Sequence, residues 1–135
     1  MQVFLTKWME RHARRERISD ANLSEAIKRA EMGLVDADLG GGLIKQRVAR
    51  AGKGRSGGYR TIIAYRRGGR AVFLYCFAKS ERENIGPDEL KTWREIAAIW
   101  MPADEQRIAR GLEAGELEEV EYGSEKDKPN GGSAS

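Results

Sequence analysis

The clearest pattern of apolar and polar positions lies between residues 59 and 78. Val72 to Ala78 (VFLYCFA) is a continuous run of β-branched, aromatic and aliphatic residues, which is typical of a central strand covered on both faces. Residues 59–66 (YRTIIAYR) form a similar run, and Gly68-Gly69 separates the two. Such a two-residue loop predicts a β-hairpin, because both central residues of the favoured turn need positive φ.

A two-residue loop also predicts the pairing of the two strands. It sets Arg67 opposite Arg70 and Arg60 opposite Phe77. One face then carries Arg60, Ile62, Ala64, Phe73, Tyr75 and Phe77. The opposite face is predicted to pack against helices, and it carries Thr61, Ile63, Val72, Leu74 and Cys76. Lys79 follows in phase with Phe77, so we expect it roughly 5–8 Å from Arg60.

A third strand is predicted at residues 43–49 (LIKQRVA), where apolar and basic side chains alternate. If Ile44 and Val48 point into the core, Lys45 and Arg47 join the face that carries Arg60. Residues 51–58 (AGKGRSGG) connect this strand to the hairpin, and the glycines of this basic loop let its backbone approach a polyanion closely.

Apolar residues at helical spacing predict helices around these strands. Residues 6–17 form the first, capped by Thr6, and a second runs from an N-cap at Ser19 or Asp20 to Gly33. Together they form an antiparallel pair able to cover one face of the sheet.

A third helix begins at Pro87, and its apolar stripe is predicted to pack on the sheet: Leu90, Trp93, Ile96, Ala97 and Trp100. Residues 3–5 are predicted to form a short edge strand, residues 103–112 a helix, and residues 117–122 either a short strand or a partner-binding segment.

The 135 residues are enough for one hydrophobic core. Because Pro102 breaks the third helix and the composition changes after it, we expect a domain over residues 1–101 and a helical, acidic extension over residues 102–122. Residues 123–135 have the composition of a disordered tail.

Charge is distributed unevenly along the chain. Residues 39–80 contain no Asp or Glu but ten cations: Lys45, Arg47, Arg50, Lys53, Arg55, Arg60, Arg66, Arg67, Arg70 and Lys79. Up to Met101 there are 20 Lys and Arg against 12 Asp and Glu, a net charge of +8, and beyond it 4 against 9, a net charge of −5. Solvated surfaces usually mix both signs, so the acid-free window indicates a surface for a polyanion. Solubility alone is enough to explain the acidic tail.

Several classes of protein are excluded by residue usage. Cys76 is the only cysteine, so disulfides and cysteine-based zinc sites are excluded, and His12 is the only histidine, so His-Cys and multi-His sites lack partners. No stretch approaches the ~20 apolar residues of a membrane span, and no secretory signal is visible at the N-terminus. We therefore expect a cytoplasmic protein with no membrane contact. No P-loop, HExxH or GxSxG motif is present.

Three pieces in a fixed order carry a resemblance to a known family: LIKQRVA, GKGRSGGYR, and FLYCFAKSERENI followed by a helix that opens with Asp-Glu-Leu-Lys. Over about residues 1–100 the chain resembles the RelE/HigB branch of the RelE/ParE toxin superfamily, from bacterial type II toxin–antitoxin systems. The resemblance implies an α+β fold, with a small, twisted, mostly antiparallel sheet, two N-terminal helices on one face and a C-terminal helix. It also implies cleavage of mRNA in the ribosomal A site without metal or cofactor, with the RNA 2′-hydroxyl as nucleophile.

The resemblance assigns roles to the cations. Arg60 resembles the sheet arginine that contacts the scissile phosphate, and Lys79 stands where the family has a second catalytic cation. Lys45 and Arg47 match the basic pair on the preceding strand. The loop residues Lys53 and Arg55 resemble those that grip flanking phosphates, and we predict that Arg50 and Tyr75 also bind RNA.

Tyrosine is where this chain departs from the family. Classical RelE proteins have a functional tyrosine near the chain end, whereas Tyr122 lies here in an acidic context and is not assigned that role. Tyr75 is preferred over Tyr65 for base stacking, because the predicted register puts Tyr65 on the core face. The general acid and base are left open between a lysine of the cationic cluster and Glu81.

The leading hypothesis is a ribosome-dependent endoribonuclease toxin, partnered by an antitoxin that is a helix-turn-helix DNA-binding protein, and acting on ribosome and mRNA. A non-catalytic RNA- or DNA-binding module is the alternative, because basic sheets often only hold phosphates. A relative that acts on gyrase is disfavoured, since such ParE-like members generally lack the cationic cluster.

Overall fold

In the computed structural model, residues 1–50, 54–81 and 85–123 are described, with the side chains of residues 54–56 excepted. The strands are β1 (Gln2–Thr6), β2 (Ala37–Gly40), β3 (Leu43–Arg50), β4 (Gly54–Arg66), β5 (Arg70–Ala78) and β6 (Leu117–Val120). The helices are α1 (Lys7–Glu16), α2 (Asp20–Glu31), α3 (Pro87–Trp100) and α4 (Glu105–Glu113).

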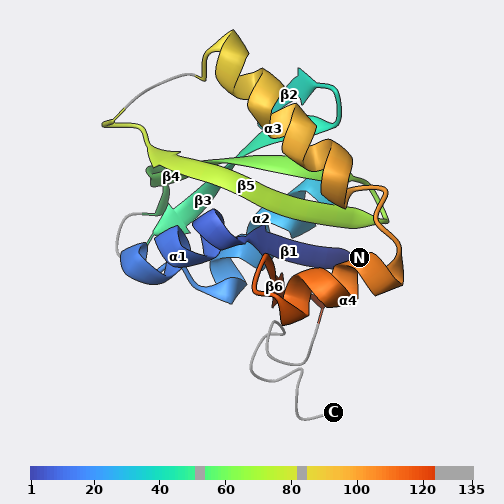
Figure 1. Cartoon of the computed structure of the whole chain (residues 1–135). Helices are drawn as coiled ribbons and strands as arrows, with labels where there is room; N and C mark the ends of the chain where they lie inside the picture. Colours follow the sequence, from blue (N-terminus) through green and yellow to red (C-terminus); the bar gives the residue numbers. More distant parts are fainter. Residues whose placement is uncertain (51–53, 82–84, 124–135) are drawn as a thin grey trace.

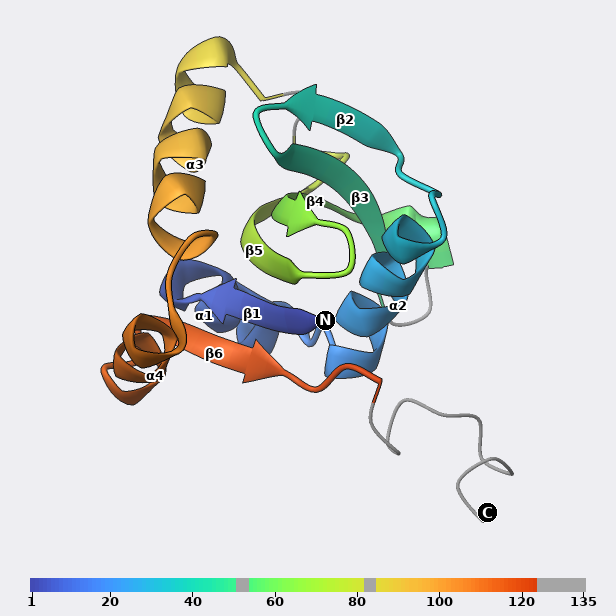
Figure 2. The ribbon, with the colours of Figure 1, turned by 90° about the vertical axis from the view of Figure 1, so that its right-hand side faces the viewer.

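The strands form one open, twisted sheet in the order β2-β3-β4-β5-β1-β6 (Figures 1 and 2). Every neighbouring pair is antiparallel except β1 and β5, which are parallel. Helix α2 lies on one side of the sheet and α3 on the other (Figure 2). The predicted α+β fold with a mostly antiparallel sheet is therefore confirmed.

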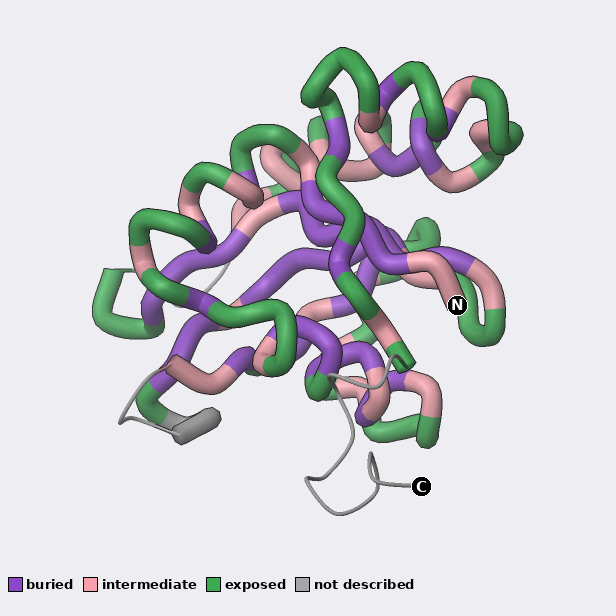
Figure 3. The backbone as a smooth tube through the Cα atoms, turned by 90° about the horizontal axis from the view of Figure 1, so that it is seen from below, coloured by how far each residue is buried: buried purple, intermediate pink, exposed green. Residues whose placement is uncertain are grey.

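Each face of the sheet has its own core. Under α1 and α2, Leu23 and Ile27 pack with sheet residues such as Ile63 and Phe73. On the other face, α3 and α4 pack against residues that include Leu43, Ile62, Ala64 and Leu74. Buried residues accordingly follow the central strands, while exposed residues lie on the outward turns of the helices (Figure 3).

The first three helices begin at the residues that the sequence indicates, whereas α4, predicted from residue 103, begins at Glu105. Thr6 Oγ1 accepts from the Met9 backbone N–H at 3.3 Å, and Ser19 Oγ accepts from Asn22 N–H at 3.1 Å. Helix α3 starts with Pro87 at its first position. These caps satisfy backbone donors that the first turn of a helix leaves free, which explains why local sequence places the helix starts correctly.

The hairpin differs from its prediction in two ways. Its loop has three residues, because Arg66 rather than Arg67 pairs with Arg70, and a β-bulge at Leu74 then shifts the register by one residue. The two shifts cancel beyond the bulge, so the predicted pairing of Arg60 with Phe77 is confirmed.

On β5, between the loop and the bulge, the predicted faces are wrong, whereas those of the facing β4 residues Ile63 and Ala64 are confirmed. Phe73 packs under α1 and α2, whereas Val72 and Leu74 pack on the α3 side. The face assigned to Arg60, Ile62 and Tyr75 therefore carries α3, and both faces of the hairpin are covered by helices.

The first strand differs from expectation, whereas the last one agrees with it. Residues 3–5 belong to β1, which is not an edge strand, because β6 pairs with its outer side. Of the two alternatives for residues 117–122, the strand is confirmed at β6. Strand β2 was not predicted. In the described ranges, no helix combines the length and the apolarity needed to cross a membrane.

Candidate active site

Three of the four cations expected to act together lie on the α3 face of the sheet. The register sets Arg47 opposite Arg60, and Lys45 opposite Ile62, which in turn pairs with Tyr75. Paired residues point to the same face, so Lys45, Arg47, Arg60 and Tyr75 share one surface. We call these three cations and one tyrosine, which lie in two neighbouring rows across the strands, the cationic rows. The predicted common face of Lys45, Arg47 and Arg60 is confirmed.

The cationic rows differ in exposure from their apolar neighbours. Ile62 and Phe77, which stand beside Lys45 and Arg60, are buried, whereas Lys45 and Arg60 are half-buried. Neither Lys45 nor Arg60 forms an ion pair with another residue in the described ranges. Within these ranges their charges are therefore not neutralised, and partial burial strengthens the attraction of such a charge for an anion relative to open water.

Arg47 is held differently, by Asp36 in the segment before β2. One Asp36 carboxylate oxygen accepts from the Arg47 backbone N–H at 2.7 Å, and the other lies 3.5 Å from the Arg47 guanidinium. Arg29 approaches the same carboxylate at 3.5 Å. Burial raises the pKa of Asp36, but the hydrogen bonds and charges of Arg47 and Arg29 outweigh it and lower the pKa overall. Asp36 thus orients Arg47 and offsets part of its charge.

Two indole rings hold Tyr75 in place. Its ring centroid is 4.8 Å from that of Trp8 in α1 and 5.1 Å from that of Trp93 in α3. Trp8 in turn stacks on His12 at 4.8 Å. Sequence reasoning missed the roles of Trp8 and Trp93 beside Tyr75, because helix periodicity indicates only that an aromatic residue faces inward.

Lys79 follows β5 rather than belonging to it. The Glu81 backbone N–H donates to the Ala78 carbonyl at 3.0 Å, so Lys79 and Ser80 are the central residues of a tight turn. The Glu81 carboxylate accepts from Ala78 N–H at 3.0 Å and fixes this turn. Strand alternation therefore ends at Ala78 and does not extend to Lys79, whose position beside Arg60 stays a prediction.

The predicted RNA-binding residues are spread over different places. The Arg50 guanidinium lies 4.8 Å over the Tyr59 ring, whose side chain belongs to the core under α1 and α2. Lys53 lies outside the described residues, and so does the side chain of Arg55. Arg50 is thus not shown to join Arg60, and the roles of all three stay predictions.

Arg50 lines a polar cavity of about 310 Å³ near the C-terminal end of β5, where Ala78 also lines it. Here the Glu16 carboxylate accepts from the Tyr59 hydroxyl, and Arg15 donates to His12 Nδ1 at 2.8 Å. Burial, followed by the charge of Arg15, lowers the pKa of His12, while the Tyr59 hydrogen bond lowers the pKa of Glu16. In the described ranges, no three His, Cys, Asp or Glu side chains gather as a metal site.

The arrangement is suited to phosphate chemistry. Arginine donates in a fork that matches phosphate oxygens, and lysine adds a compact point charge. Cations already in place need little reorganisation as negative charge develops on a phosphate, which is the usual source of electrostatic catalysis. The cationic rows can therefore bind a phosphodiester and stabilise its charge.

Comparison with known families gives a match over residues 1–120, to the model described as the RelE toxin of the RelE / RelB toxin-antitoxin system. No curated protein matches the chain.

Proposed function

Because the chain belongs to the RelE family of toxins from toxin–antitoxin systems, we propose that it is a ribosome-dependent, metal-independent mRNA endoribonuclease of the RelE/HigB kind. The observation that carries the proposal is the pairing of Arg47 with Arg60 beside Lys45, on one face of the sheet. A toxin of such a system has an antitoxin as its partner. We further propose that this antitoxin is a helix-turn-helix DNA-binding protein, and that the toxin acts in the cytoplasm, where ribosomes translate mRNA.

In the proposed reaction, the RNA 2′-hydroxyl attacks the adjacent phosphorus. A bond from the 2′-oxygen to phosphorus forms, the bond to the 5′-oxygen breaks, and the products are a 2′,3′-cyclic phosphate and a 5′-hydroxyl. Arg60 and Lys79 stabilise the charge on the phosphate, with Lys45 and Arg47 beside them. The 2′-hydroxyl loses its proton to a base, and the leaving 5′-oxygen gains one from an acid.

We propose that Tyr75 contacts RNA through its hydroxyl and not through the face of its ring. Two indoles already pack against this ring, at 4.8 and 5.1 Å between centroids, so a base has less of it to stack on. A hydroxyl on the same face as Lys45 and Arg60 can donate to a phosphate oxygen. Lys53, Arg55 and Arg50 are proposed to hold flanking phosphates.

The experiment is a translation reaction with purified ribosomes and one mRNA, in which 5′ ends are mapped after the toxin is added. Codon-phased cleavage that requires the ribosome supports the proposal. Arg60→Ala should slow cleavage about 10²- to 10³-fold, and Arg60→Ala with Lys79→Ala should abolish it. Arg110→Ala, an exposed arginine on α4, is the matched control. A fully active double variant would show that the site is wrongly assigned.

Two further variants separate the roles of Tyr75. Tyr75→Phe removes only the hydroxyl and should slow cleavage about 10²-fold at an unchanged melting temperature. If Tyr75→Phe cleaves at the parent rate while Tyr75→Leu does not, the ring rather than the hydroxyl is what matters.

A phosphate-binding module without catalysis is the second candidate, because the cationic rows on their own need only bind. It predicts intact messages together with RNA affinity that falls steeply with salt concentration. The mapped 5′ ends decide between the two.

A further inference from the structure

A second cationic site lies at the other end of the sheet. A cavity of about 370 Å³ opens where the β2–β3 turn (Gly41 and Gly42) and the end of β4 (Arg66) meet α3. Arg66 is six residues along β4 from Arg60, which corresponds to roughly 20 Å of extended strand. The Arg66 end of the cavity is therefore well away from Arg60, and the Gly42 end is three residues from Lys45.

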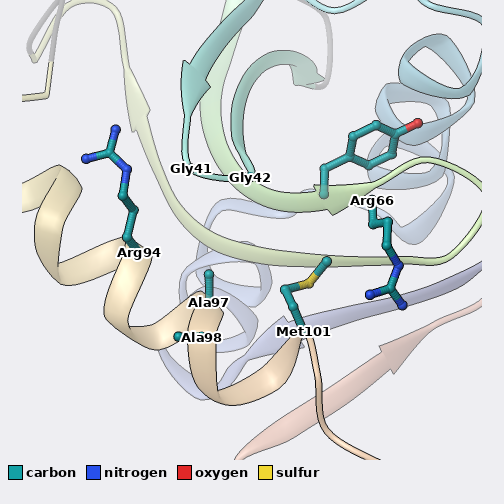
Figure 4. Close-up of a pocket in the computed structure, with 8 residues that line it drawn as sticks. Gly41, Gly42, Arg66, Arg94, Ala97, Ala98 and Met101 are labelled. Atoms are coloured by element: carbon teal, nitrogen blue, oxygen red, sulfur yellow. The ribbon is translucent and has the colours of Figure 1, made fainter.

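Two arginines come from opposite sides of this cavity (Figure 4). Arg94 of α3 reaches the β2–β3 turn, where it donates to the Leu39 carbonyl at 2.7 Å and to the Gly40 carbonyl at 3.4 Å. Its side chain lies over Gly41, where an added Cβ would stand 2.6 Å from Arg94 Nε. The glycine thus creates the space in which Arg94 is fixed.

Neither arginine is neutralised within the described part of the chain. Arg94 donates to carbonyls, not carboxylates, and no ion pair of Arg66 or Arg94 with another described residue is present. No residue that lines the cavity is acidic. Two positive charges therefore border one hollow without a counter-charge, which favours an anionic ligand.

The floor between the arginines is aliphatic. Ala97 and Ala98 of α3 and Met101 at its C-cap form it, and Figure 4 shows these residues further along the helix from Arg94, on the way to Arg66. Tyr65 also lines the cavity, but its hydroxyl donates to Glu31 on the α2 side of the sheet. The floor therefore offers packing for an aliphatic side chain rather than an aromatic plane for a nucleobase.

We propose that this cavity binds a segment of the antitoxin in which acidic residues flank an aliphatic side chain. The aliphatic group packs on Ala97, Ala98 and Met101, and the carboxylates pair with Arg66 and Arg94. Charge complementarity selects this occupant, since both free charges at the rim are positive and the floor is apolar. The inference rests on membership in a toxin–antitoxin family and not on nuclease activity.

The test uses a pair of substitutions at one exposed position. Ala98 lines the cavity and stands four residues after Arg94 in α3, so Ala98→Glu places a carboxylate beside Arg94, and Ala98→Lys adds a side chain of similar length but opposite charge. Both residues are good helix formers, so neither should disturb the helix. Arg66→Glu is a third variant, from a different element.

The full-length chain is titrated by calorimetry with the protein encoded by the adjacent open reading frame. Ala98→Glu and Arg66→Glu should each weaken binding at least 10-fold, and Ala98→Lys should bind like the parent or more tightly. Equal weakening by Ala98→Glu and Ala98→Lys, parent-like binding by Ala98→Glu, or no binding by the parent would each overturn the proposal.

A parallel titration with a 20-nucleotide single-stranded RNA tests the other macromolecule. If Ala98→Glu weakens binding of RNA but not of the protein, the cavity is an RNA site and the proposal is wrong. Because neither titration contains ribosomes or measures cleavage, the result stands apart from the success or failure of the proposed nuclease function.

Discussion

Arg66 and Arg70 are register partners at the end of the β4–β5 hairpin, yet their surroundings differ completely. Arg66 is exposed, whereas Arg70 is only 5% exposed. The Arg70 guanidinium donates to the carbonyls of Trp100, Met101 and Ala103 at 2.8, 3.2 and 2.7 Å, and to Gln2 Oε1 at 3.0 and 2.8 Å. It thereby joins the end of α3 to β1 and β5.

Replacing Arg70 with Met keeps most of the side-chain volume and removes every one of these donors. The carbonyls of Met101 and Ala103 and Gln2 Oε1 then lose their Arg70 donors, at about 1 kcal/mol for each acceptor left unsatisfied, whereas the Trp100 carbonyl still accepts from the Ala103 N–H at 3.3 Å. We therefore expect Arg70→Met to lower the free energy of unfolding by about 3 kcal/mol, and the melting temperature by about 10 °C. Arg66→Met removes the same charge from an exposed position and should cost less than about 0.5 kcal/mol.

Urea unfolding, followed by circular dichroism, measures both variants against the parent. The slope of unfolding free energy against urea concentration should be the same for the variants and the parent. An unchanged slope shows that the folded and unfolded states are as compact as in the parent, so that the unfolding midpoints report stability alone. The reasoning is refuted if Arg70→Met unfolds within 1 kcal/mol of the parent, or if the two substitutions cost the same.

Two further predictions concern pH and the β2–β3 turn. Burial, followed by the hydrogen bond to Glu16, raises the pKa of Tyr59 to about 12 from 10.0, so its contribution to stability is complete below pH 10 and is lost between pH 10 and about 12. Tyr59→Phe should therefore flatten the fall of unfolding free energy over this range in urea titrations, and an unchanged slope would contradict the assignment. An added Cβ at Gly33 would have no neighbour within 4 Å, so Gly33→Ala should lower the free energy of unfolding by about 1 kcal/mol for its positive φ alone. Gly41→Ala also displaces the Arg94 side chain and should lower it by about 2 kcal/mol. Equal losses in thermal unfolding would show that Arg94 does not depend on Gly41.

The hairpin shows what local sequence can and cannot predict. Two runs of strand-forming residues around glycines indicate a hairpin, and this was right. The length of the loop and the bulge at Leu74 were not visible, because a bulge is selected by how both faces pack rather than by a local preference. The pairing of Arg60 with Phe77 was correct only because the two errors cancelled.

The charge pattern locates the basic region without showing which cations face solvent. Arg70 belongs to the acid-free window, but its side chain is buried and donates hydrogen bonds to the end of α3 and to Gln2 of β1. Arg50 lies over Tyr59, whose side chain belongs to the core under α1 and α2. Alternation along β3 placed Lys45 and Arg47 correctly, since period two is a local property, whereas the partners of a long side chain depend on tertiary packing.

The order of the strands in the sheet was the feature least predictable from the sequence. Nothing in residues 3–5 indicates that they will lie between β5 and β6 rather than at an edge, because the choice of a distant partner strand leaves no mark on the strand itself. Four-residue β2 and β6 are also too short for alternation to identify them alone.

The position of β1 governs when the toxin can finish folding. Its apolar core residues Val3, Phe4 and Leu5 pair with β5 on one side and with β6, more than a hundred residues later, on the other. Contacts of such sequence separation slow folding, and an uncovered strand edge invites aggregation. A nascent chain therefore cannot close its sheet until residue 120 has been synthesised. Deletion of β6 should accordingly yield an aggregation-prone protein rather than a shorter toxin.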